Sequence, residues 1–109
     1  LTPFAADNQD TAVQNFVKKY QEKYNATPDQ FAADGYDAVY TVVAALKQAN
    51  LTSEDKDNFN SRIVAAMTKI EVKGVTGTMT WTADGESSKA AIAMEYRNGK
   101  AVLFTPDKE

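Results

Sequence analysis

Apolar residues recur at helical spacing near the start of the chain. Between residues 11 and 24 they return every three or four positions, while lysine, glutamine and glutamate occupy the other side. This pattern predicts an amphipathic helix over residues 11–24. Either Asp10 or Thr11 can serve as its N-cap. The apolar stripe consists of Val13, Phe16, Val17, Tyr20 and Tyr24.

A longer and more apolar stretch follows, and we predict a helix over residues 28–48. Thr27 and Gln30 have the spacing of a capping box, with Pro28 at the first helical position. Many small alanines surround the large side chains, which indicates close neighbours on more than one side of the helix. The predicted buried side consists of Phe31, Tyr36, Val39, Tyr40, Val43 and Leu46.

A third helical pattern predicts a helix over residues 53–70. Thr52 or Ser53 can cap its start, where the carboxylates of Glu54 and Asp55 meet the positive end of the helix. Its apolar stripe consists of Phe59, Ile63, Met67 and Ile70.

Beyond Glu71 the pattern changes to a period of two, which is typical of strands. Residues 75–82 alternate, which predicts one strand with four threonines on the opposite face. Asp84-Gly85 marks a turn, and Asn98-Gly99 predicts a β-hairpin over residues 91–104. The tail, residues 105–109, is expected to fray. One face of the strand over residues 75–82 consists of Val75, Gly77, Met79 and Trp81.

Taken alone, the chain is therefore expected to have an α+β appearance, with three helices followed by about three antiparallel strands. The second helix is too apolar for one sheet face to cover it. We therefore expect some of its packing partners to lie outside this chain.

Composition excludes several classes of function. The 109 residues are 43% hydrophobic and carry a net charge of −3 without a basic cluster, which argues against nucleic-acid binding. The chain has no cysteine and no histidine, so the usual zinc sites and the Ser-His or Cys-His nucleophile pairs are excluded. We expect no metal and no cofactor. No apolar run reaches the roughly 18 residues that a membrane span needs.

Several residue patterns hint at chemistry, but each has a simpler structural reading. Asp34 and Asp37 share a helix face and could form an acid–base pair, although carboxylates near a helix start are commonly structural. Residues 55–60 resemble a calcium loop only faintly, because Phe59 occupies a ligand position. Asn25 and Asn50 begin glycosylation triplets, yet both also fit helix ends.

The glycines and aromatic residues also have structural readings. Gly74 and Gly77 lack the lysine and hydroxyl residue of a phosphate loop and fit a backbone bend. Phe31, Tyr36 and Tyr40 could stack on a ligand, but their helical spacing is typical of core residues. Trp81 alternates into the buried face of its predicted strand and is also expected in the core.

The order of several segments resembles one known family. "TPFAAD" leads into the first helix, "FAADGYDAVY" and "ALKQA" form the second, and "GVTGTMTWTADGE" precedes a hairpin ending in "RNGKAV". This order resembles the C-terminal third of branched-chain amino-acid-type (Leu/Ile/Val) solute-binding proteins of ABC transporters. The resemblance covers about residues 1–104. It implies the type I periplasmic binding fold, an α/β fold with two Rossmann-like lobes.

The resemblance implies roles for individual residues near the start of the second helix. Phe31 matches an aromatic contact to the ligand side chain, and Ala33, Asp34 and Tyr36 are neighbouring candidates for lining the ligand cleft. The helix would pack against the parallel sheet of the N-terminal lobe. Gly35 would then allow close backbone approach, Tyr36 would point to the lobe interior, and the first helical turns would favour the charge of Asp37.

The resemblance also implies how the chain divides between the lobes. Residues 1–73 would belong to the N-terminal lobe, and residues 74–109 would form a strand and hairpin that cross to the other lobe. Pro3, Phe4 and Ala5 match one interlobe crossing. Gly74 to Gly77 lie near another. The chain would be a fragment, and its parent's principal ligand contacts would lie upstream of Leu1.

The implied function is capture of an amino acid between two lobes and its delivery to an ABC permease, without a chemical step. The parent protein would be periplasmic or lipid-anchored outside the cytoplasmic membrane. As a fragment, the chain is expected to dimerise through its uncovered helix face. Two alternatives remain open from the residues: a small autonomous α+β protein-interaction domain that uses its hairpin edge, and an acid–base enzyme using Asp34 and Asp37.

Overall fold

The computed structural model describes residues 2–106, and its first helix confirms the prediction. α1 spans Thr11–Tyr24. Asp10 is its N-cap, because the Asp10 carboxylate accepts hydrogen bonds from the backbone N–H groups of Ala12 and Val13. Asn25 ends the helix in the left-handed conformation, with φ 51°. The asparagine of the first glycosylation triplet is thus a helix C-cap.

α2 spans Gln30–Ala49 and ends at Asn50, which is also left-handed, with φ 51°. The predicted capping box is wrong. The N-cap is Asp29, whose carboxylate accepts a hydrogen bond from the Ala32 N–H. The Thr27 hydroxyl instead accepts a hydrogen bond from Gln21, and the Gln30 side chain accepts one from the Thr2 hydroxyl. A carboxylate one residue before the helix displaced the weaker hydroxyl cap.

α3 is shorter than predicted and spans Phe59–Met67. The residues expected to start it form a separate turn. The Asp55 carboxylate accepts hydrogen bonds from the N–H and hydroxyl of Thr52 and pairs with Arg62 at 3.0 Å. Because the side chains of Thr52 and Asp55 are engaged in this turn, neither is at the start of the helix. The helix begins after Asn58, which is left-handed and makes no side-chain cap.

The single strand predicted over residues 75–82 is wrong, because this region is the second half of a tight hairpin. β1 spans Val72–Gly74 and pairs antiparallel with β2, Gly77–Met79, so that Val72 lies opposite Met79. The turn between them holds Val75 and Thr76. Thr76 is buried rather than solvent-facing. The period-two pattern of threonines continues through the turn, so the sequence pattern did not indicate it.

The C-terminal hairpin confirms the prediction. β3 spans Met94–Arg97 and pairs antiparallel with β4, Lys100–Leu103. The connecting Asn98 and Gly99 both have positive φ, 51° and 76°. The turn expected at Asp84-Gly85 is also present, with the Gly85 N–H bonded to the Thr82 carbonyl. Of the tail, residues 105 and 106 are exposed and irregular, and residues 107–109 lie outside the described part.

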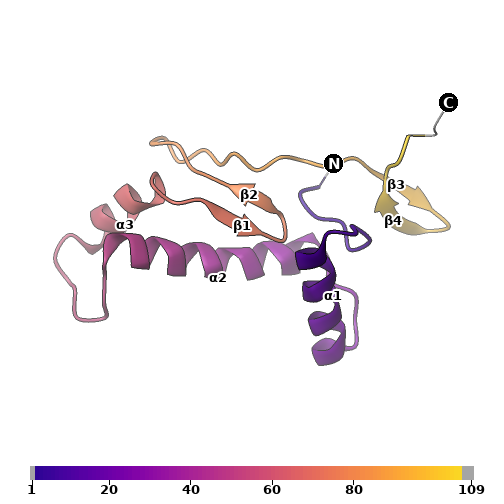
Figure 1. The fold of residues 1–109 in the computed structure, drawn as a ribbon, viewed down its shortest axis with the longest axis horizontal. Coiled ribbons are helices and arrows are strands. Elements are labelled where there is room, and N and C mark those ends of the chain that lie inside the picture. The colour runs from indigo at the N-terminus through magenta and orange to yellow at the C-terminus, as the bar shows by residue number, and fades with distance from the viewer. Residues whose placement is uncertain (1, 107–109) are drawn as a thin grey trace.

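α2 is the central helix, along which the other elements are arranged (Figure 1). α1 lies at its start, α3 at its end, and the β1–β2 hairpin along its length, while β3–β4 stands apart beyond a long connecting segment. Two apolar clusters hold these parts together. One joins α1 and the start of α2 through Phe4, Val13, Phe16, Val17, Ala33 and Val75. The other joins α2, α3 and the hairpin through Ala45, Ile70, Val72 and Met79.

The chain is extended for its length. Its radius of gyration is 16.8 Å, whereas a compact domain of this size would have about 13 Å. Its accessible surface is 8042 Å², against about 5,900 Å² for a compact monomer of the same mass. The fold leaves about 2,000 Å² more surface open to solvent than compaction would allow.

Much of this surface comes from α2, and here the predicted buried side is wrong for this chain. Ala33, Asp37 and Ala45 are the buried residues of the helix. Large apolar side chains elsewhere on the helix are exposed, although the ring of Tyr36 packs against Phe16 of α1. The exposed apolar face consists of Phe31, Tyr36, Val39, Tyr40, Val42 and Val43. The expectation that α2 needs partners on more than one side agrees with this exposure.

Candidate functional site

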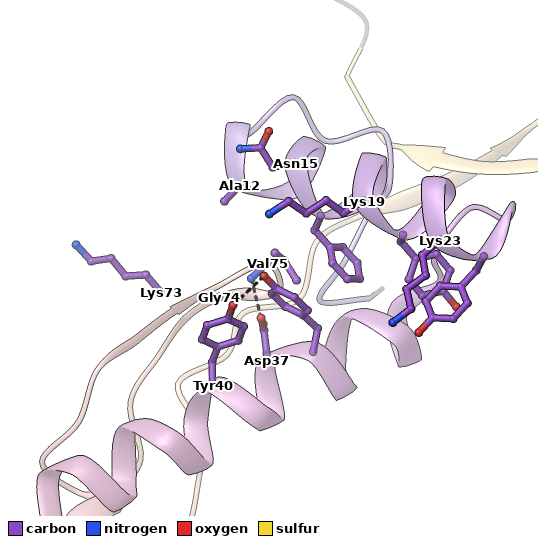
Figure 2. Close-up of a pocket in the computed structure, with 13 residues that line it drawn as sticks. Ala12, Asn15, Lys19, Lys23, Asp37, Tyr40, Lys73, Gly74 and Val75 are labelled. Carbon is purple, nitrogen blue, oxygen red and sulfur yellow. Dashed lines mark hydrogen bonds between the residues drawn. The ribbon is translucent and has the colours of Figure 1, made fainter.

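The most strongly built polar contact joins α2 to the β1–β2 turn. Asp37 is only 2% exposed. Its carboxylate accepts hydrogen bonds from the backbone N–H of Val75 at 2.9 Å, from the N–H of Thr76 at 2.9 Å, and from the Thr76 hydroxyl. Figure 2 shows Asp37 projecting from the helix toward Val75. These three donors compensate the burial of a charge, so Asp37 fixes the hairpin on the helix.

The positions of two glycines follow from this contact. A side chain at Gly74 would overlap the Asp37 carboxylate, so glycine is required where the hairpin passes over α2. Gly35 was the glycine expected to allow close approach, but a Cβ there would meet nothing within 4 Å in this structure. Asp37 also lies two turns into α2, so the charge preference of a helix start does not explain it.

The predicted ligand-lining residues divide between different surroundings. Phe31 is 73% exposed at the start of α2. Asp34 pairs with Lys89 at 2.9 Å. Tyr36 faces the groove between α1 and α2. Ala33 is fully buried in the cluster around Phe16, so its methyl group is not available to line a cleft. Phe31, Asp34 and Tyr36 keep accessible side chains.

An aromatic groove of about 530 Å³ separates α1 from α2 (Figure 2). The rings of Phe16 and Tyr36 lie 4.8 Å apart, and those of Tyr36 and Tyr40 lie 4.9 Å apart. The Tyr36 hydroxyl donates a hydrogen bond to that of Tyr40 at 3.3 Å. This hydrogen bond, with a contribution from burial, raises the pKa of Tyr36. Lys19, Lys23 and Lys73 also line the groove.

The residues predicted to form the two interlobe crossings have different surroundings. Phe4 and Ala5 are buried in the chain's own core, and Thr2 pairs antiparallel with Ile92. Gly74 and Gly77 belong to the hairpin packed on α2. The segment that runs beside the first crossing is therefore the one around Lys89 and Ile92. Sequence reasoning missed Lys89, which belongs to no regular pattern, and assigned Ile92 to the hairpin over residues 91–104 without its pairing to Thr2.

Both carboxylates of the acid–base alternative make contacts with other residues of the chain. The carboxylate of Asp34 is engaged by Lys89, and that of Asp37 by the β1–β2 turn. Within the described residues, no group of histidine, cysteine, aspartate or glutamate side chains is suited to a metal ion. In residues 2–106, no helix has the length and apolar character to cross a membrane.

Solved structures with this arrangement belong to solute-binding proteins of ABC transporters. A putative branched-chain amino acid ABC transporter from Rhodospirillum rubrum is 31% identical, with a TM-score of 0.71, over 94% of this chain and 29% of its own. A substrate-binding protein from Desulfitobacterium hafniense in complex with Leu is 22% identical, with a TM-score of 0.75, over 93% of this chain and 29% of its own. A solute-binding protein from R. palustris in complex with benzoate is 24% identical, with a TM-score of 0.75, over 93% of this chain and 27% of its own.

The family described as Periplasmic binding protein matches residues 1–101, and the chain belongs to this family. The expected type I periplasmic binding fold is confirmed. Curated protein sequences yield no match. The chain spans between 27% and 29% of the length of the three relatives. Their additional length is consistent with the uncovered face of α2.

Proposed function

We propose that this chain is part of an extracytoplasmic solute-binding protein that captures a small molecule between two lobes and delivers it to an ABC importer. The observation that carries the proposal is the family match over residues 1–101. The relatives bound to Leu and to benzoate share the fold, which supports a small molecule with a carboxylate as the ligand class to test. We infer an amino acid, with a branched-chain one as the first candidate.

The exposed start of α2 supports this function physically. Phe31 presents an uncovered aromatic ring, and the accessible Asp34 lies one turn further along the helix. Ligand pockets combine apolar walls with a few polar groups that fix orientation. We therefore propose Phe31, Asp34 and Tyr36 as the contributions of this chain to the ligand cleft, which the rest of the protein completes.

We propose that the chain contributes to both lobes. The helices and the β1–β2 hairpin would belong to the N-terminal lobe, and β3–β4 to the other. The boundary predicted between residues 73 and 74 falls inside β1. The irregular segment before β3 offers a more suitable crossing, because a hinge needs residues that can change φ and ψ.

The test is thermal unfolding of the full-length protein with a panel of amino acids and with benzoate. A ligand that binds only the folded state stabilises it by about 2.7 kcal/mol at 100 times its Kd, so the midpoint should rise. Phe31→Ala should reduce this rise. The matched control Tyr96→Ala removes an exposed ring from β3 and should not reduce it. If no compound in the panel raises the midpoint, the ligand class is wrong.

A further inference from the structure

The connecting segment Ser87–Ile92 contacts the rest of the chain at three places. At its start Ser87 pairs with Trp81, and Ser88 exchanges hydrogen bonds with Thr80 at 3.0 Å and 2.9 Å. The Lys89 ammonium donates a hydrogen bond to the Asp34 carboxylate at 2.9 Å. Ile92 pairs with Thr2, through N–H···O distances of 2.8 Å and 3.2 Å. In Figure 1 this segment runs from the β1–β2 side of the molecule, past the N-terminus, to β3–β4. It therefore links the helices to the β3–β4 hairpin, which also contacts the N-terminal part of the chain through the Leu103 N–H and the Asp7 carboxylate.

The pair of Asp34 and Lys89 differs from the other ion pairs in residues 2–106. The others join residues within one helix, one strand or one short region, namely Lys18–Glu22, Arg62–Asp55 and Arg97–Glu95. Asp34 and Lys89 are 55 residues apart. Their side chains are 40% and 25% exposed, so the pair is partly shielded from solvent.

Among the described residues that line the cavity around this pair, no other charged side chain competes for Lys89 or Asp34. The shallow cavity that both residues line also contains Asp37, but the carboxylate of Asp37 is engaged by the β1–β2 turn. The remaining lining residues are uncharged. Lys89 is therefore the one cation that lines this cavity opposite Asp34.

From this geometry we propose that Lys89 is a positioning residue that latches the connecting segment to the start of α2. It holds the Asp34 carboxylate in place and limits the rotation of β3–β4 relative to the helices. The effect on ligand binding rests on the proposed function, in which the two parts belong to different lobes. A segment that is already restrained loses less conformational freedom when the lobes close, so the latch increases ligand affinity.

The test compares Lys89→Met with wild type in the full-length protein. The first measurement is amide hydrogen exchange of Ile92 without ligand, which should become faster because between the Ser88–Thr80 contact and Ile92 no side chain then ties the segment to α2. The second is calorimetric binding of L-leucine, with benzoate as the second probe. The Kd should rise by about 1.5- to fivefold, the range expected for breaking a partly exposed ion pair. The Kd of the variant should also depend less on salt.

Four further variants separate a latch from a general structural role. Lys89→Arg keeps the charge and should restore both Ile92 protection and affinity. Asp34→Asn should speed Ile92 exchange as much as Lys89→Met, and the double variant should add nothing further. Arg97→Met breaks the Arg97–Glu95 pair within β3, which is 2.7 Å long, and should leave Ile92 exchange unchanged.

The two proposals fail in different ways. If Lys89→Met leaves the exchange of Ile92 at the wild-type rate, the latch is wrong, whether or not the protein binds a ligand. If Ile92 exchange rises but the Kd of a bound probe stays constant, the coupling to affinity is wrong. If wild type binds neither probe while Ile92 exchange rises as expected, the latch stands as a local restraint and the inferred ligand class fails.

Discussion

Asp37 and Thr76 lie 39 residues apart in the chain and are joined by two hydrogen bonds, one from the Thr76 backbone N–H and one from its hydroxyl. Both residues are almost completely buried. The helix thus carries the acceptor and the hairpin turn carries the donors. The triplet Gly35-Tyr36-Asp37 is consequently more than a helix start, because its carboxylate determines where the β1–β2 hairpin sits.

Replacing Asp37 by asparagine should destabilise the folded chain. An amide has one acceptor oxygen in place of two, and its NH₂ group would face the backbone donors of the turn. Leaving a buried donor unsatisfied costs about 1–3 kcal/mol. Urea unfolding followed by circular dichroism measures this loss. Thr76→Ser keeps all three donors and serves as the control, so an equal loss in both variants would contradict the assignment.

Gly74→Ala and Gly35→Ala should have opposite effects in the 109-residue chain. A methyl group at Gly74 would overlap the Asp37 carboxylate, and overpacking of this kind costs about 1–3 kcal/mol. Gly35 lies in a helix with open space around it, so alanine should stabilise by about 0.5–1 kcal/mol. Unfolding midpoints of the two variants check this contrast. Destabilisation by Gly35→Ala only in the full-length protein would show that another part of that protein packs there.

The helices could be predicted from the sequence because local signals determine them. The stripe from Val13 to Tyr24 and the N-cap Asp10 both depend on residues within a few positions of each other. The Asn98-Gly99 turn is similarly local. The family resemblance, confirmed over residues 1–101, supplied the parent fold, which no local pattern contains.

Some errors arose where distant residues decide the structure, and others where nearby side chains form contacts that the pattern does not show. The burial of Thr76 depends on Asp37 in another element, and the alternation of threonines gave no sign of it. The late start of α3 depends on the contact of Asp55 with Arg62. In the candidate site, exposure identified Phe31 as accessible and Ala33 as buried, although both belong to the same motif. Lys89 was missed because its partner Asp34 lies 55 residues away.

Ionisation of Tyr36 should lower the free energy of unfolding at alkaline pH. Its pKa is raised above the ordinary value of 10.0, chiefly by the hydrogen bond to Tyr40. Because the folded pKa lies above the unfolded one, this contribution is complete below pH 10 and is lost as the pH rises through the raised pKa. Tyr40→Phe removes the hydrogen bond and should lower the pKa of Tyr36. Titration of tyrosinate absorbance measures the pKa in wild type and in Tyr40→Phe. The variant Tyr36→Phe shows which part of the titration curve belongs to Tyr36. An unchanged titration in Tyr40→Phe would contradict the cause.

The exposed face of α2 should make the isolated 109-residue chain self-associate. Val39 is 64% exposed on this face. The excess surface of one chain, about 2,000 Å², exceeds the roughly 800 Å² that each partner buries in a standard interface. Light scattering should therefore give a mass above the 11.9 kDa of one chain. A hydrophobic dye should bind the dissociated chain, because a large apolar patch remains open.

A charge on this face should oppose the association. Val39→Lys places an ammonium group in the apolar contact, so the dissociation constant should rise at least tenfold, since burying an unpaired charge is costly. Val64→Lys is the matched control, because Val64 is similarly exposed, at 61%, but belongs to α3 rather than to α2. Equal weakening by both variants would place the contact elsewhere. A well-folded monomer that binds no dye would mean that the chain covers this face by itself, and it would favour the autonomous interaction domain over the solute-binding protein.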